Sequence, residues 1–336
     1  MFPTLTPQQY QQNLARLRSG MSLDAAAEAS TGQVFLQSEL TRIDPVLRMP
    51  LENYTHYRDI PMPSGGGWMD FEVARNVDFR GPQDGSTGTD SNDVRVIEYN
   101  TDQDVWPTLP YQVNVRIPLI ESLKMATTGR SPQDLLDKAV RVDWQKSLDV
   151  RVYQGIKGNT GLVNSPIVTS QLVVAGAAGP RTWASKTPQE IYNDFNTMAY
   201  TAWNNAGGSP LAIPDRYLVP GSQWSALTQP MVVGGTPLAL SVAQYLKENG
   251  FAKTFGITPE IYPLPVWLET AGASSSKRVI SYRFDQDCLS FTLLQNIQRM
   301  GGPLSVQAGA FLITYVGNTG VVKVNRPQTI NYWDGV

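Results

Sequence analysis

The sequence predicts an α+β fold from two observations. The first is a single long helix over residues 131–156, in which every fourth residue from Leu136 to Ile156 is apolar. The second is a series of short segments that alternate apolar and polar residues, as strands do, between clusters of turn formers. A chain of 336 residues can bury a sizeable core, in one elaborated domain or in two to three small ones.

Composition limits the classes of function. Only 17% of the residues are charged, which is below the usual quarter and favours a surface that meets other protein. The net charge of −2 gives no general signature of nucleic-acid binding, and no apolar run approaches the ~20 residues of a membrane span. The N-terminus lacks the features of a signal peptide. Cys288 is the only cysteine, so no intrachain disulfide forms, which fits a reducing cytoplasm.

Residues 1–58 are predicted to form a helical arm. One short helix begins at Thr6-Pro7 and stops at Gly20, and Ser22 can cap a second. The apolar stripe of these helices is too thin to make them stable alone. The arm therefore either docks on a partner or packs on its own domain, and the sequence favours neither.

Residues 59–117 are predicted to form a long β-hairpin. In its first strand Glu72 lies on one face, and Phe71 and Val73 lie on the other. A tip at 81–93 is dense in turn formers. Because two strands alone are marginally stable in water, the hairpin must lie on something. The predicted strands are residues 68–79, 94–99 and 111–117.

The predicted hairpin is acidic. Residues 59–110 hold ten acidic and three basic residues, a net charge of −7, whereas residues 111–336 sum to +5. This asymmetry favours a head-to-tail contact in which the hairpin of one copy rests on the body of the next. The alternative is that the acids simply keep a loop soluble. The candidate contact residues are Trp68 in the hairpin, Asp84, Asp90 and Asp93 at its tip, and Arg141 and Arg151 on the long helix.

The long helix has defined ends. Ser131 can cap it, Pro132 suits the first helical position, and Gly155 and Gly158 stop it. A spacing of four exceeds the 3.6-residue turn, so the apolar stripe winds around the helix. Different neighbours should therefore cover its two ends. Taken alone, such a stripe is most typical of a buried core helix.

The remaining elements mix strands and helices. Thr187-Pro188-Gln189-Glu190 is a capping box that opens a helix ended by Gly207-Gly208. The other predicted elements are strands at 167–175, 217–220 and 279–284, helices at 222–229 and 237–249, and a closing hairpin that pairs 311–316 with 321–325.

Residues suited to catalysis are scarce. His56 is the only histidine and lies far in sequence from Cys288, so nucleophilic triads and zinc sites lack their parts. The tip at 84–93 offers oxygen ligands for calcium but not in the EF-hand order. Gly65-Gly66-Gly67 is not followed by the lysine of a phosphate-binding loop. We therefore expect no catalytic, cofactor-binding or metal-binding residues.

The order of these parts resembles the major capsid proteins of tailed bacteriophages of the Hong Kong 97 type. Tyr217-Leu218-Val219-Pro220-Gly221-Ser222 is similar to the strand, proline and short helix of that family's axial domain, and Arg278–Tyr282 resembles a later strand of it. Gly161-Leu162-Val163-Asn164 is similar to the loop after the family's spine helix. The resemblance covers most of the chain and lies in organisation more than in one rigid motif.

The resemblance implies an HK97-like capsid fold with an arm, an extended loop, and peripheral and axial domains. Copies would self-assemble into pentamers and hexamers of an icosahedral head around double-stranded DNA, held without sequence specificity. The virion would be assembled in the host cytoplasm without a membrane, with separate scaffolding, decoration and portal proteins as further partners. Arg141 and Arg151 would serve the hairpin contact or face the genome. The implied parts are the N-terminal arm 1–58, the extended loop 59–117, the peripheral domain 118–186 plus 301–336 with spine helix 131–156, and the axial domain 187–300.

Two departures from the family are informative. Some members join a lysine of the extended loop to a neighbour's asparagine, but the first lysine here is Lys124, so residues 59–117 hold none. We therefore expect no crosslink of that kind. No long helical segment precedes the arm, so scaffolding is expected from a separate protein or from a segment already removed.

Alternatives remain open at this point. Encapsulins share the fold and enclose protein cargo in place of DNA. From another class, the chain would be an α+β enzyme with a Gly-rich lid at 81–93, restricted to carboxylate-only catalysis by the scarcity of His and Cys. A tail or baseplate subunit is a further option, although such proteins are usually richer in strands than residues 131–250.

Overall fold

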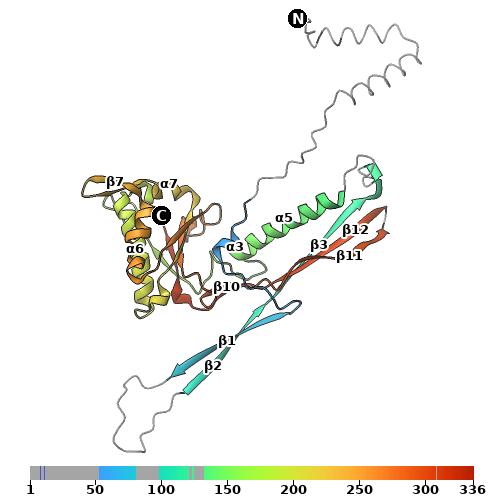
Figure 1. Cartoon of the computed structure of the whole chain (residues 1–336), viewed down its shortest axis with the longest axis horizontal. Coiled ribbons are helices and arrows are strands. Elements are labelled where there is room, and N and C mark those ends of the chain that lie inside the picture. The colour runs from blue at the N-terminus through green and yellow to red at the C-terminus, as the bar shows by residue number, and fades with distance from the viewer. Residues whose placement is uncertain are drawn as a thin grey trace, which may run out of the picture. The chain divides into compact units, whose positions relative to one another are not determined.

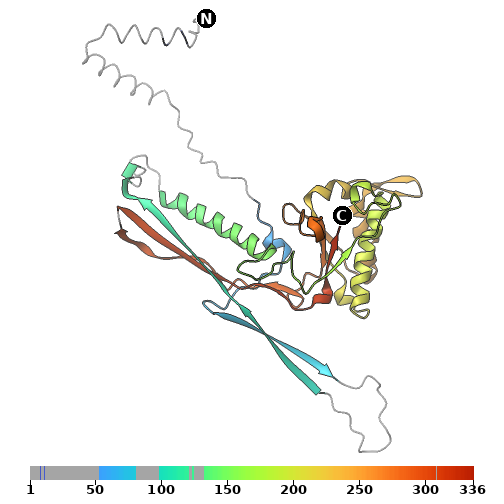
Figure 2. The ribbon, with the colours of Figure 1, turned by 180° about the vertical axis from the view of Figure 1, so that it is seen from behind.

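The computed structural model describes residues 53–80, 98–120, 123–124, 132–307 and 309–336, together with Gln8 and Gln11. The chain divides into two compact units, Met1–Asn53 and Tyr54–Val336, and the elements below all belong to the second. Apart from Gln8 and Gln11, the predicted arm helices lie outside the described residues, as does the predicted hairpin tip. The described chain mixes helices and strands, as predicted (Figures 1 and 2).

The helices follow the capping signals of the sequence. At the predicted capping box, Thr187 Oγ1 accepts from Glu190 N, and the Glu190 carboxylate accepts from Thr187 N at 2.8 Å. The helices are α3 (His56–Asp59), α5 (Pro132–Tyr153), α6 (Pro188–Asn205), α7 (Trp224–Leu227) and α8 (Val242–Asn249). Short 3-10 turns are η1 (Trp183–Ser185), η2 (Pro210–Ala212), η3 (Gly221–Gln223), η4 (Phe251–Phe255), η5 (Ala273–Ser275) and η6 (Pro327–Thr329).

Two sheets form most of the folded body. A five-stranded sheet has the order β4-β14-β9-β5-β8, and a three-stranded sheet has the order β11-β12-β3. The first contains β4 (Thr169–Leu172), β14 (Ile330–Asp334), β9 (Arg278–Tyr282), β5 (Arg216–Pro220) and β8 (Glu260–Leu264). The second contains β11 (Gln295–Gln307), β12 (Ala310–Thr319) and β3 (Leu109–Pro118).

The other strands form two-stranded pairs. The pair of most interest is the long antiparallel hairpin of β1 (Phe71–Arg80) and β2 (Glu98–Pro107), labelled in Figure 1. The remaining pairs are β6 (Pro230–Val233) with β7 (Thr236–Ser241), and β10 (Leu289–Phe291) with β13 (Val322–Val324).

The winding stripe of α5 meets two different neighbours, as predicted. Near its N-terminal end, Val140 packs with Ile313 and Tyr315 against the three-stranded sheet. Near its C-terminal end, Leu148 and Val152 join a second core that includes one face of the five-stranded sheet. The opposite face of that sheet is covered by α6 and α8 in a third cluster. The long helix therefore connects the two sheets.

Several predicted strand boundaries were wrong. The strand predicted at 94–99 corresponds to β2, which continues through the polar residues 100–104. Pairing with β1 holds these residues in a strand, although local propensity does not favour one. β3 was predicted as part of the hairpin, but it pairs with β12.

The predicted closing hairpin does not form. β12 continues through Gly317, where a Cβ would lie 2.9 Å from the Trp144 ring, and β13 pairs with β10. The glycine thus provides room for a tryptophan and does not make a turn.

Residues 237–241 were predicted as helix but form most of β7. Gly234 and Gly235 have φ of +59° and +83°, so they make a tight turn that returns the chain along β6. The helix α8 begins only after Ser241, whose side chain and that of Gln244 form a second capping box.

Candidate assembly interface

The β1–β2 hairpin has an apolar face. Its antiparallel register pairs Val73 with Val105 and Val77 with Thr101, so these side chains lie on the same side, with the polar pair of Arg75 and Gln103 between them. Large apolar residues there are exposed, from 45% at Val73 to 72% at Tyr99. We call Phe71, Val73, Val77, Tyr99 and Val105 the apolar face of the hairpin.

The opposite face of the hairpin carries carboxylates. Asp102 and Asp104 lie on it and are exposed. Glu72, closer to the base, is held within the subunit: its Oε1 accepts from Thr292 Oγ1 at 2.8 Å and pairs with Lys323 Nζ. The charge of Glu72 is therefore neutralised within the subunit, whereas Asp102 and Asp104 place exposed carboxylates farther along the hairpin.

Side chains of the body anchor the base of the hairpin. Asn318 Nδ2 on β12 donates to the carbonyls of Gly67 and Met69, at 3.2 Å each. Thr108 Oγ1 donates to Met69 O at 2.6 Å. An exposed apolar face on an element anchored in this way is suited to contact another molecule.

The structure places most predicted contact residues at the surface or outside its described part. Trp68 is half exposed, and Arg141 on α5 is exposed. Asp84, Asp90 and Asp93 lie outside the described residues. The predicted alternation of the first strand matches the register, but Val105 was missed because the second strand was predicted to end at Tyr99. The available signal was the alternation of Tyr99, Thr101, Gln103 and Val105 with Asn100, Asp102 and Asp104.

Arg151 requires a correction, because it is buried within the subunit. Only 6% of it is exposed, and its Nη1 donates to Leu109 O at 2.7 Å and to Thr319 Oγ1 at 2.6 Å. Burial lowers the pKa of Arg151. The residue next to it, Val152, belongs to the buried stripe of α5. Arg151 thus joins α5 to the ends of β3 and β12, and it is not available to a neighbouring copy.

The remaining charges of α5 are unequally exposed. Three of its acids accept hydrogen bonds within the subunit: Asp137 from Tyr315 Oη, Asp143 from Tyr111 Oη and Asp149 from the backbone N of His56. Burial, together with the hydrogen bond to Asp137, raises the pKa of Tyr315 to about 12. Lys138 and Arg141 are exposed on the same helix. Lys138 and Arg141 therefore present positive charge at the surface of α5, although Asp143 is exposed there as well.

The single histidine and the single cysteine both lie inside the subunit. His56 Nδ1 lies 2.7 Å from Asp149 Oδ1, and Cys288 is a buried free thiol. In the part of the chain that the structure describes, no group of three or more His, Cys, Asp or Glu residues could hold a metal ion. Over the same residues, no helix is long and apolar enough to cross a membrane.

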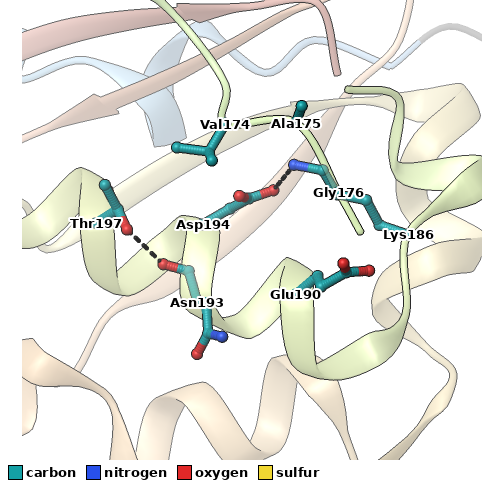
Figure 3. Close-up of a pocket in the computed structure, with 8 residues that line it drawn as sticks. All are labelled: Val174, Ala175, Gly176, Lys186, Glu190, Asn193, Asp194 and Thr197. Atoms are coloured by element: carbon teal, nitrogen blue, oxygen red, sulfur yellow. Dashed lines mark hydrogen bonds and ion pairs between the residues drawn. The ribbon is translucent and has the colours of Figure 1, made fainter. Parts of the chain in front are cut away.

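A pocket of about 230 Å³ lies between α6 and the chain that follows β4 (Figure 3). Lys186 Nζ and Asp194 Oδ2 form a buried pair at 2.6 Å, and Asp194 Oδ2 also accepts from Trp183 Nε1 at 2.9 Å. Because these groups satisfy one another, the geometry of the pocket does not indicate catalysis.

Known proteins share this organisation. A family model described as "Major capsid protein" matches residues 85–336. The capsid of Myoviridae phage XM1 has a TM-score of 0.70 and 12% identity, over 89% of this chain and 98% of that one. The capsid of a native GTA particle has a TM-score of 0.59 and 10% identity, over 88% and 94%. A chain of Microbacterium phage Oxtober96 has a TM-score of 0.55 and 8% identity, also over 88% and 94%. No curated protein sequence matches significantly.

Proposed function

Because the chain belongs to the major capsid protein family and has the HK97-like capsid fold, we propose that its copies form the pentamers and hexamers of an icosahedral phage head around double-stranded DNA. The family is one of structural proteins and not of enzymes. In this proposal the head is assembled in the host cytoplasm and becomes part of the virion. Separate scaffolding, decoration and portal proteins are further partners, and DNA is held without sequence specificity.

The observation that carries the proposal is the anchored hairpin with an exposed apolar face. Full burial of a large apolar side chain contributes about 1.5–3 kcal/mol, whereas an exposed ion pair contributes about 0–1 kcal/mol. The apolar face, led by Phe71 and Val105, therefore supplies most of the contact energy, and charge supplies orientation. The hairpin of one copy crosses the body of the next in this arrangement.

The proposed partner surface is positive and includes α5. Lys138 and Arg141 are exposed there, and the hairpin presents Asp102. Trp68 and the tip acids Asp84, Asp90 and Asp93 belong to the same proposed contact. A contact between two different surfaces closes into rings of identical copies when the rotation fits. Many weak contacts per copy then act together to hold a shell.

Electron microscopy of the purified chain tests the proposal. We expect closed shells, or rings of five and six subunits, in the fraction excluded from a gel-filtration column. A chain that remains monomeric at high concentration even when it is produced together with the proposed scaffolding protein contradicts assembly. DNA in heads isolated from infected cells is the expected content, and a protein cargo in its place contradicts that part of the proposal.

A further inference from the structure

One edge of the five-stranded sheet is protected by its own chain. Pro263 in β8 has no N–H to offer, and its carbonyl accepts from Arg58 Nη2 at 3.5 Å. The guanidinium of Arg58 also lies 4.2 Å from the centre of the Tyr262 ring. Proline and a covering side chain are common ways to block an edge strand. No further strand is expected to add at β8.

The opposite edge, β4, is open. Val173 N donates to Asp334 O of β14 at 3.1 Å. Because the backbone groups of a strand point alternately to its two sides, those of Leu172 and Val174 point away from β14. Neither residue makes a backbone hydrogen bond there to any residue that the structure describes. Leu172 is 56% exposed and Val174 is 61% exposed.

The pocket of Figure 3 lies beside this open edge. Val174, Ala175 and Gly176 form one wall of it, and Asn193 and Thr197 on α6 contribute to the other. The arrangement combines unpaired backbone groups, exposed apolar side chains and an adjacent hollow. These are the three features by which a sheet edge receives an extended chain.

The charge of the pocket favours a basic or amide side chain. Lys186 and Asp194 neutralise each other, which leaves the Glu190 carboxylate as the unbalanced charge among the lining residues. Hydrogen bonds, first that from Ala177 N and then those from Thr187, hold the pKa of Glu190 below its ordinary value. Glu190 is therefore ionised at neutral pH. The body of the chain, residues 111–336, has the complementary charge of +5.

We propose that an extended segment of a second copy adds to β4 as a sixth strand and places one side chain in the adjacent pocket. The inference rests on the proposed function, since self-assembly supplies the second copy. The unpaired groups are backbone amides and carbonyls that repeat along the edge, which suits a peptide and not a small ligand. The negative charge at the pocket disfavours DNA as the occupant.

Hydrogen–deuterium exchange at single-residue resolution tests this inference. The amides of Leu172 and Val174 should exchange at least tenfold more slowly in assembled shells than in unassembled subunits. The amide of Val173, already bonded to β14, should change little and serves as an internal control. If shells form but the first two amides exchange equally fast in both states, the inference is overturned and the proposed function stands. If no shells form even with the proposed scaffolding protein present, neither the inference nor the proposed function holds.

A proline substitution gives a second test. Leu172→Pro removes the outward N–H but leaves the bond from Val173 N to Asp334 O. We expect at least a tenfold lower shell yield, whereas Leu172→Ile, which keeps the N–H, should assemble normally. Assembly of Leu172→Pro at the wild-type yield would overturn the inference. If the proline lowers the unfolding temperature of the subunit, a low shell yield has a second explanation. The hydrogen–deuterium exchange of the Leu172 and Val174 amides in the wild-type chain then tests the inference.

Discussion

Gly155 and Gly161 close the C-terminal end of α5 with contacts that a side chain would prevent. A Cβ at Gly161 would lie 2.2 Å from Tyr153 O, and a Cβ at Gly155 would lie 2.1 Å from Asn159 O. This close approach lets Leu162 N donate to Val152 O at 2.8 Å, which satisfies one of the terminal carbonyls of the helix. The loop after α5 is therefore held against it by backbone geometry.

We predict that Gly161→Ala destabilises the subunit by at least ~2 kcal/mol, because its Cβ meets the backbone and no flexible side chain can move away. Gly158→Ala in the same loop is the matched control. Gly158 has φ of +84°, but a Cβ there meets nothing within 4 Å, so only the cost of the left-handed conformation, about 1–2 kcal/mol, is expected. Denaturant unfolding measures both. An equal loss in the two variants would contradict the steric explanation.

The buried pair of Arg278 and Asp334 links three parts of the body. Arg278 Nε and Nη2 donate to Asp334 at 2.7 and 2.9 Å, and Nη1 donates to Val163 O at 2.7 Å. Burial opposes ionisation of Asp334, but hydrogen bonds from Arg278 and Ser170 outweigh it and keep the pKa of Asp334 below its ordinary value. The carboxylate is thus more acidic in the folded chain.

This shift predicts a pH dependence of stability. Because folding lowers the pKa of Asp334, its stabilising contribution is complete above the unfolded-state value of about 3.9 and is lost as the pH falls through the folded-state value. Asp334→Asn should cost about 3 kcal/mol at neutral pH, since it leaves Arg278 buried and unpaired. The difference from wild type should shrink below pH 4. Unfolding free energies measured across pH 2–7 test this, and a constant difference would refute it.

At the scale of elements, α5 was predictable because its signals are local. The apolar residues at a spacing of four, the proline at the first position and the glycines after the end all act within the helix. The same holds for the capping box of α6. The winding of the apolar stripe also predicted that different elements would cover the two ends of α5. It did not indicate which sheets these elements would be.

The strands were less predictable because their partners are distant. β2 runs through Asn100–Asp104, where the asparagine and the two aspartates disfavour a strand, and its pairing with β1 accounts for it. Arg151 was misassigned for a related reason. Its partners, Leu109 and Thr319, are far away in sequence, so nothing local distinguished it from the exposed Arg141.

The hairpin supports a prediction about its apolar face. Val73→Lys with Val105→Lys places two charges opposite each other on that face and should reduce shell yield at least tenfold. Both residues are exposed in the subunit, so its unfolding temperature should change little. The control is Val73→Thr with Val105→Thr, which keeps the branched shape and should assemble more fully. Normal shells from the lysine variant would contradict contact through this face.

Charge on α5 should act in a salt-dependent way. Lys138→Glu with Arg141→Glu is expected to slow assembly several-fold at low salt, with the effect fading towards 0.5 M salt because exposed charges are screened. Arg151→Met is the contrasting variant. It removes the two buried hydrogen bonds that Arg151 donates to Leu109 O and Thr319 Oγ1, so it should lower thermal stability at every salt concentration. Light scattering and thermal unfolding separate the two effects, and equal salt dependence would contradict the assignment.

In the molecule as a whole, residues 54–336 combine well-buried cores with surfaces that stay uncovered in one copy. The two sheets and α5 bury their apolar faces within the subunit. The apolar face of the hairpin and the open edge at β4 do not. A closed shell satisfies such surfaces in every copy at once, so that contacts too weak to hold a dimer can hold the assembly.

We predict that the shell is held without covalent bonds between copies. Residues 59–117 contain no lysine, so the hairpin cannot supply the amine of an isopeptide bond, and Cys288 is buried. Denaturing gel electrophoresis of intact shells should therefore give a single band near the monomer mass of 37.0 kDa, with or without reductant. A ladder of multimers would contradict this. Because every contact is reversible, dissociation by denaturant should also be steep and concentration-dependent, since the loss of one contact weakens those that act with it.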